Sequence, residues 1–112
     1  PLERKRYCFD GFVVDKPARS VTAPRGEDIP LTGAEFDLLL LFLERPGRVL
    51  SRDQLLDLTR RSGSEVLDRS IDVLVSRLRR KLSAGGAAPI FKTVRNGGYQ
   101  LAVKVSVPDP RI

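Results

Sequence analysis

The chain has no histidine, no methionine and no tryptophan among its 112 residues, and its single cysteine is Cys8. One thiol cannot form a disulfide framework, and without histidine most zinc sites are excluded. The Ser-His and Cys-His pairs of nucleophilic catalysis and the commonest general base are missing too. The acidic residues are scattered along the chain. We therefore expect no catalytic site, no metal and no cofactor, and we expect Cys8 to be an inert, partly buried thiol.

Long apolar runs are also absent. The longest, residues 38–43, is far shorter than the roughly 20 residues of a membrane span and fits the middle of a buried helix. The basic residues at the N-terminus are not followed by the apolar segment of a secretory signal. A hydrophobic content of 41% with 30% charged residues is typical of one soluble globular domain. We expect a cytoplasmic protein with no membrane contact and no small-molecule ligand.

The positive charge is unevenly distributed. The formal net charge is +6, which favours a polyanionic partner. Residues 69–82 hold five basic side chains against one acid, Asp72. Within 68–82, apolar residues recur at helical spacing: Ile71, Val75, Leu78 and Leu82. The remaining faces of this helix carry arginines and hydroxyl groups, a combination suited to the major groove of DNA.

Short strands are expected ahead of residue 32. Turn residues at 10–11, 15–18 and 24–28 separate β-branched and aromatic segments, the last of them at 29–31. Four brief strands joined by tight turns predict an antiparallel N-terminal sheet.

Three helices are expected next. Thr32 and Glu35 have the spacing of a capping box, and the helix that they open should end near Glu44. Ser51 and Gln54 have the same spacing and should open a short second helix. A polar loop at 60–67 leads to the basic helix, for which Asp68 is a candidate N-cap.

A hairpin closes the pattern. Asn96-Gly97 lies between apolar segments at 90–94 and 99–103, and both residue types tolerate the positive φ of a tight turn. The order of helix, short helix, basic helix and hairpin predicts a winged helix-turn-helix. The expected fold class is α+β, with a four-stranded antiparallel sheet, three helices and a hairpin wing.

These residues resemble a known family. Arg69-Ser-Ile-Asp-Val73, Arg77-Leu-Arg79, Lys81-Leu82, Thr93-Val-Arg95 and Gly98-Tyr99 are similar to the OmpR/PhoB-type effector domain of bacterial two-component response regulators. The resemblance implies sequence-specific binding of double-stranded DNA. It also implies a phosphorylated receiver domain that this stretch lacks. Residues 1–6 would end the interdomain linker, 7–104 would form the DNA-binding domain, and 105–112 would be a flexible tail.

The resemblance also assigns roles to individual side chains. Those expected to read bases are Ser70, Val73, Leu74 and Arg77. Those expected to contact phosphates or the backbone are Arg69, Ser76, Arg79, Arg80, Lys81, Thr93 and Arg95. Their chemistry agrees, because a guanidinium can pair with guanine, apolar groups can contact thymine methyls, and arginines neutralise phosphates.

The expected partners follow from the same family. Two domains would bind direct repeats head-to-tail, and RNA polymerase would contact the loop at 60–67. Arg60 and Arg61 fit such a contact, a phosphate contact or a solvated loop. Asp72 lies within reach of Arg69 and Ser76 on its own helix and is interpreted as a charge partner that holds arginines in place. Tyr99 is interpreted as a packing residue of the hairpin, with a hydrogen bond to a helix carbonyl as the alternative.

Other functions remain open. The domain could belong to a membrane-tethered or single-domain regulator, or the winged helix could be a protein–protein module whose basic helix meets an acidic partner. Binding to random duplex DNA at low salt separates the last case from DNA recognition. For the DNA-binding interpretation, the expected location is the bacterial cytoplasm, with the nucleoid as the site of the bound form.

Overall fold

The computed structural model describes residues 6–61, 70–86, 90–95 and 97–107. Several sequence-based expectations fall outside these residues. They concern Asp68 as N-cap, Arg69 as a phosphate contact, the loop beyond residue 61 as a polymerase contact, and Asn96 in the hairpin turn.

The N-terminal sheet contains β1 (Arg6–Phe9), β2 (Phe12–Asp15) and β3 (Ser20–Thr22), antiparallel in that order. Asp10 and Gly11 join the first two strands with φ values of +47° and +82°. This is the backbone of a two-residue hairpin turn, in which both central residues are left-handed. A Cβ atom on Gly11 would lie 2.9 Å from the side chain of Pro24, so only glycine fits there.

The prediction of a fourth strand at residues 29–31 is wrong. Ile29 donates one backbone hydrogen bond to the carbonyl of Val21 at 2.9 Å, and Asp28 makes an isolated bridge to Thr22. Pro30 has no N–H with which to continue the pairing. The sheet therefore has three strands in the part of the chain that the structure describes.

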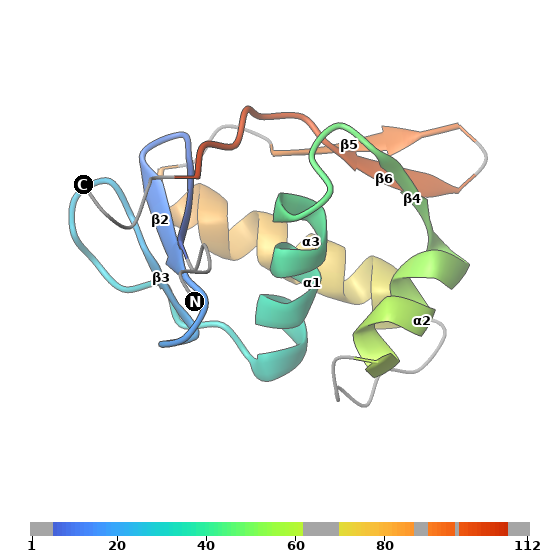
Figure 1. The fold of residues 1–112 in the computed structure, drawn as a ribbon, viewed down its shortest axis with the longest axis horizontal. Helices are drawn as coiled ribbons and strands as arrows, with labels where there is room; N and C mark the ends of the chain where they lie inside the picture. Colours follow the sequence, from blue (N-terminus) through green and yellow to red (C-terminus); the bar gives the residue numbers. More distant parts are fainter. Residues whose placement is uncertain (1–5, 62–69, 87–89, 96, 108–112) are drawn as a thin grey trace.

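Three helices follow, as predicted: α1 (Gly33–Leu43), α2 (Arg52–Arg61) and α3 (Ser70–Ala84). Every residue of α1 from Glu35 to Leu43 is buried, so α1 is the centre of the fold. Both α2 and α3 pack against it, and α3 crosses behind it in Figure 1. The core lies between these helices and the two sheets.

Both predicted capping boxes are confirmed. The Thr32 hydroxyl accepts a hydrogen bond from the backbone N–H of Glu35 at 3.2 Å, and the Glu35 carboxylate accepts one from the backbone N–H of Thr32 at 2.9 Å. Ser51 and Gln54 make the same reciprocal pair at 3.1 and 2.9 Å. Each box thereby satisfies one of the first helical N–H groups, which lack partners within a helix, and the N–H of the cap residue.

Replacing Thr32 with alanine should lower the free energy of unfolding by about 1 kcal/mol, because one hydrogen bond of the cap is lost at the start of the central helix. Urea unfolding followed by circular dichroism measures the change. Ser83→Ala is the matched control, because Ser83 belongs to α3, is exposed and does not cap a helix. Equal losses in the two variants would show that the Thr32 cap has no special weight.

The second sheet contains β4 (Val49–Ser51), β5 (Phe91–Val94) and β6 (Gly98–Leu101), in the antiparallel order β4-β6-β5. The hairpin of β5 and β6 is confirmed, and Gly97 adopts a φ of +86° in its turn. The sequence did not predict β4. The hairpin and the N-terminal sheet lie at opposite ends of the molecule, whose long axis measures 40 Å (Figure 1).

The prediction that a flexible tail starts at residue 105 is wrong for residues 105 and 106. Ser106 and Cys8 exchange backbone hydrogen bonds of 2.8 Å in each direction, and Val105 packs against the core. The outer edge of β1 has unpaired backbone groups, and Ser106 satisfies two of them. The chain is therefore held to the N-terminal sheet as far as Ser106.

Candidate nucleic-acid interface

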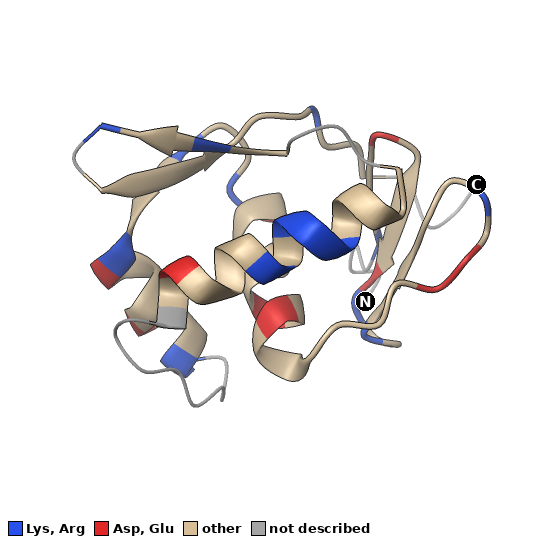
Figure 2. Cartoon of the chain, turned by 180° about the vertical axis from the view of Figure 1, so that it is seen from behind, with Lys and Arg blue, Asp and Glu red and all other residues tan. Residues whose placement is uncertain are grey.

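Helix α3 has one buried and one exposed face. The buried side chains are Ile71, Leu74, Val75, Leu78 and Leu82. The exposed ones include Val73, Ser76, Arg77 and Arg80, all four of which were predicted to contact DNA. Basic residues lie along the middle and the C-terminal half of the helix (Figure 2). Ser70 is the first residue of α3, and the structure does not describe its side chain.

Leu74 does not lie on the exposed face. Its side chain is 7% exposed and belongs to the core cluster, whereas the neighbouring Val73 is 45% exposed. The apolar stripe of α3 is wide because the helix packs against both α1 and α2. The expectation that Leu74 contacts thymine methyls is therefore corrected: it is a core residue.

Arg77 and Arg80 lie one turn apart on the exposed face. With Thr32, Glu35 and Lys81 they line a hollow of about 260 Å³ between α3 and the start of α1. Within the described residues, neither arginine makes a hydrogen bond or an ion pair. Both guanidinium groups therefore have their donors available for an anionic partner.

Lys81, the third cation of this hollow, has a partner. Its ammonium group donates a 2.6 Å hydrogen bond to the carboxylate of Glu35, which is 1% exposed. Burial alone would raise the pKa of Glu35, but the hydrogen bonds from Lys81 and Thr32 outweigh it and hold the pKa below its ordinary value. The ammonium group has three donors, and the Lys81 side chain is 36% exposed. The phosphate contact expected of Lys81 stays a prediction, beside its pairing with Glu35 within the fold.

Asp72 also has partners other than those expected. Arg52, the first residue of α2, donates from Nε to both carboxylate oxygens at 2.8 and 3.0 Å. The hydroxyl of Tyr99 donates to the same carboxylate. The hydrogen bond from Tyr99 first, and those from Arg52 next, hold the pKa of Asp72 below its ordinary value. Asp72 thus pairs with other elements of the fold, and Ser76 is not among these partners.

Tyr99 is a packing residue, as predicted, and also a hydrogen-bond donor. Its side chain is 6% exposed, and its partner is a carboxylate rather than the helix carbonyl considered as an alternative. Burial and then the hydrogen bond to Asp72 raise the pKa of Tyr99.

Arg79 connects α3 to the hairpin. Its Nη2 atom donates to the carbonyl oxygen of Phe91 at 3.1 Å and to the hydroxyl of Thr93 at 3.2 Å. These bonds use one of the three nitrogens, so the guanidinium keeps donors for a phosphate. The two residues predicted on the hairpin, Thr93 and Arg95, are both exposed.

Sequence reasoning missed two basic residues near this face. Lys92 is exposed on β5, and Arg52 is 43% exposed beside Asp72. Lys92 follows a hydrophobic strand start and could have been found as a basic residue of the wing. Arg52 could not, because it lies 20 residues from its partner in the sequence.

Arg60 and Arg61 are exposed at the end of α2. Arg61 makes an ion pair of 3.1 Å with Asp57, one turn earlier on the same helix. This pair agrees with a solvated helix surface, and the contacts proposed for the following loop stay predictions.

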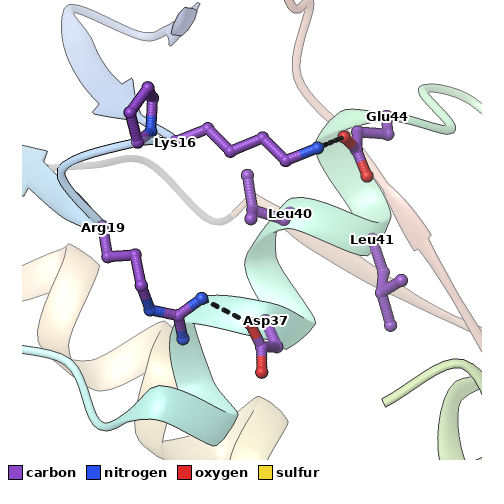
Figure 3. A pocket seen from close by; sticks show the side chains of 7 residues that line it. Lys16, Arg19, Asp37, Leu40, Leu41 and Glu44 are labelled. Atoms are coloured by element: carbon purple, nitrogen blue, oxygen red, sulfur yellow. Dashed lines mark hydrogen bonds and ion pairs between the residues drawn. The ribbon is translucent and has the colours of Figure 1, made fainter. Parts of the chain in front are cut away.

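A second hollow, of about 310 Å³, lies between α1 and the turn from β2 to β3. Lys16 pairs with Glu44 at 2.9 Å and Arg19 pairs with Asp37 at 3.0 Å across it (Figure 3). Its charges are matched within the fold, in contrast to the hollow beside Arg77 and Arg80.

Two features are absent from the residues that the structure describes. No group of three or more acidic or cysteine side chains is placed to hold a metal ion. None of the described helices has the length and apolar character needed to cross a membrane.

Comparison with known sequences identifies relatives. Regulatory protein VirG of Agrobacterium tumefaciens (strain 15955) is 45% identical over 106 residues, which are 94% of this chain and 40% of VirG. Transcriptional regulatory protein RstA of Escherichia coli (strain K12) is 42% identical over 99 residues, 88% of this chain and 41% of RstA. The chain thus spans about two fifths of the length of these relatives.

Solved structures agree. The DNA-binding domain of Klebsiella pneumoniae RstA, in complex with the RstA box, has a TM-score of 0.72 and 39% identity, covering 88% of this chain and 97% of that one. The DNA-binding domain of E. coli CadC has a TM-score of 0.80 and 26% identity, covering 96% and 100%. Response regulator DrrB, a Thermotoga maritima OmpR/PhoB homologue, has a TM-score of 0.72 and 26% identity, covering 87% and 44%.

Residues 26–101 match the family described as "Transcriptional regulatory protein, C terminal". The expected winged-helix fold and the resemblance to the OmpR/PhoB type are both confirmed. The chain therefore belongs to this family of C-terminal domains of transcriptional regulators.

Proposed function

We propose that this chain binds double-stranded DNA sequence-specifically, as the effector domain of a bacterial two-component transcription regulator. The observation that carries the proposal is the exposed face of α3, which presents Val73, Ser76, Arg77 and Arg80, and whose acidic neighbours Asp72 and Glu35 are each paired with a cation of the fold. The similarity to an RstA domain solved with its RstA box supports it.

Helix α3 is the element that enters the major groove. Its 15 residues span about 22 Å at 1.5 Å per residue, and a groove about 12 Å wide accepts one helix. Arg77 forks onto a guanine, and Val73 contacts a thymine methyl group. The side chains that contact phosphates are those of Arg69, Ser76, Arg79, Arg80 and Lys81, and Ser70 joins the base contacts.

The hairpin contacts the neighbouring backbone or minor groove through Thr93 and Arg95. Two copies bind direct repeats head-to-tail, with centres roughly 10–10.5 bp apart so that both meet the same face of the DNA. In the whole protein, a receiver domain controls dimerisation, and RNA polymerase contacts the loop after α2, near Arg60 and Arg61.

Replacing Arg77 with alanine tests the proposal. On the site selected from a random pool of duplexes, Arg77→Ala should cost roughly 1–3 kcal/mol, about 5- to 150-fold in Kd, because a bidentate base contact is lost. On a scrambled site the loss should be much smaller. Arg80→Ala is the matched control, since it removes the same charge from the same exposed face and should weaken both sites alike.

Fluorescence anisotropy with the two duplexes gives both ratios. Equal losses of Arg77→Ala on selected and scrambled DNA would show that Arg77 does not read bases. A wild-type domain that ignores random duplex DNA at low salt and binds an acidic protein would contradict DNA binding itself.

A further inference from the structure

Three elements of the interface meet at one carboxylate. Asp72 of α3 receives hydrogen bonds from Arg52 of α2 and from Tyr99 of β6. We propose that Asp72 and Tyr99 are positioning residues, which fix the hairpin relative to α3 so that both meet the same stretch of DNA. The inference rests on the proposed function and concerns how the two DNA-contacting elements are kept in register.

Arg52 connects Asp72 to the turn of the hairpin. Its Nε atom holds the carboxylate of Asp72, while its Nη1 atom donates to the carbonyl oxygen of Gly97 at 2.9 Å. One guanidinium thus joins the start of α2, the first turn of α3 and the turn of the hairpin. A planar group with several fixed donors is suited to hold three such elements at set angles.

The first strand of the hairpin, β5, is held separately. Arg79 donates to the backbone of Phe91 and to the hydroxyl of Thr93 on β5. The guanidinium carbons of Arg52 and Arg79 lie 5.6 and 5.9 Å from the ring centroid of Tyr99. Tyr99 therefore contacts both arginines, within the range of cation–π attraction, and β5 and β6 are each tied to α3.

The charge of Asp72 supports a positioning role. It is the only acidic residue of α3, and its side chain is 50% exposed on a helix proposed to lie among phosphates. A free carboxylate there would oppose binding. Paired with Arg52 and bonded to Tyr99, the carboxylate is neutralised and serves instead as the common acceptor for two neighbouring elements.

The hairpin needs such ties because of its shape. Its base packs on α1 through Phe91 and Phe42, whose ring centroids are 4.8 Å apart, but its far end lies away from α1, over the start of α2 (Figure 1). Contacts from a hairpin that moves freely would lose affinity through the cost of ordering it on DNA. The connection at Asp72 lies between the packed base and the turn.

Tyr99→Phe tests the inference because it removes the hydroxyl and keeps the ring. Binding to a duplex that covers both flanks should weaken roughly three- to tenfold. The slope of log K against log salt should become shallower by about one phosphate contact. Binding to a duplex shortened on the flank that the hairpin protects from hydroxyl radicals should not change, and the preferred bases should stay the same.

Tyr7→Phe is the matched control. The hydroxyl of Tyr7 also donates to a carboxylate, that of Glu44, at 3.1 Å, and its side chain is 8% exposed. It belongs to the N-terminal sheet, at the end of the molecule away from the hairpin. Tyr7→Phe should leave the binding of both duplexes and the salt slope unchanged.

A double-mutant cycle with Asp72→Asn completes the test. If the carboxylate and the hydroxyl act together, the double variant should lose less binding energy than the two single variants added. Strict additivity, or equal effects of Tyr99→Phe on the long and the shortened duplex, would overturn the positioning role. The positioning role would also be overturned if Tyr99→Phe bound both duplexes as tightly as wild type and lost only stability. Failure of the wild-type domain to bind DNA would instead overturn the proposed function.

Discussion

Raising the salt concentration from about 50 to about 200 mM should weaken the binding of this domain to duplex DNA by roughly a thousandfold. Each cation that neutralises a phosphate releases a counterion from the DNA, and this release is less favourable at high salt. With roughly five to seven phosphate contacts, log K should fall with log salt at a slope of about −5 to −6. The basic side chains proposed for these contacts are Arg69, Arg79, Arg80, Lys81 and Arg95.

Anisotropy titrations at several salt concentrations give this slope. Arg80→Ala should reduce its magnitude by about 0.9, the value for one phosphate on B-DNA. Tyr7→Phe, which changes no charge, should not affect it. A slope near zero for the wild-type domain would show that phosphates do not dominate its affinity, and the proposed function would be lost with it.

The second large effect concerns stability, and it separates two adjacent residues. Leu74→Ala should lower the free energy of unfolding by roughly 2–4 kcal/mol, because a leucine that is 7% exposed would leave a cavity between α3 and its neighbours. Val73→Ala should change it by less than about 0.5 kcal/mol, because that side chain is 45% exposed.

The same pair should differ in the opposite way on DNA. At a temperature where both variants are folded, Val73→Ala should weaken the preference for a thymine in the selected site, and Leu74→Ala should keep it. Urea unfolding and binding to sites with single base changes measure the two quantities. A Leu74→Ala variant as stable as wild type but altered in base preference would restore the role first expected of Leu74.

Much of the fold could be predicted because its signals are local. The capping boxes at Thr32 and Ser51 and the glycine turns at Gly11 and Gly97 each depend on residues within four positions of one another. Strand β4 has only three residues, and its pairing with β6 depends on a partner almost 50 positions away. The segment at 29–31 failed for the converse reason, since it has strand-forming residues but lacks a ladder partner.

The candidate site shows the same division. Helical spacing predicted that α3 would expose arginines on the side away from the core. It could not predict which charges cancel one another, because Asp72 finds Arg52 and Tyr99 across 20 and 27 positions, and Lys81 finds Glu35 across 46. Leu74 was corrected for a similar reason, because the helices that cover it are distant in the sequence.

The pairing of Ser106 with Cys8 also determines where this domain can be attached to other things. The first and the last described segments lie together on the N-terminal sheet, at the end of the long axis away from the hairpin (Figure 1). A dye attached beside Cys8 or Ser106 would therefore lie far from the hairpin. Such a dye could report on DNA binding without blocking the contacts of the hairpin.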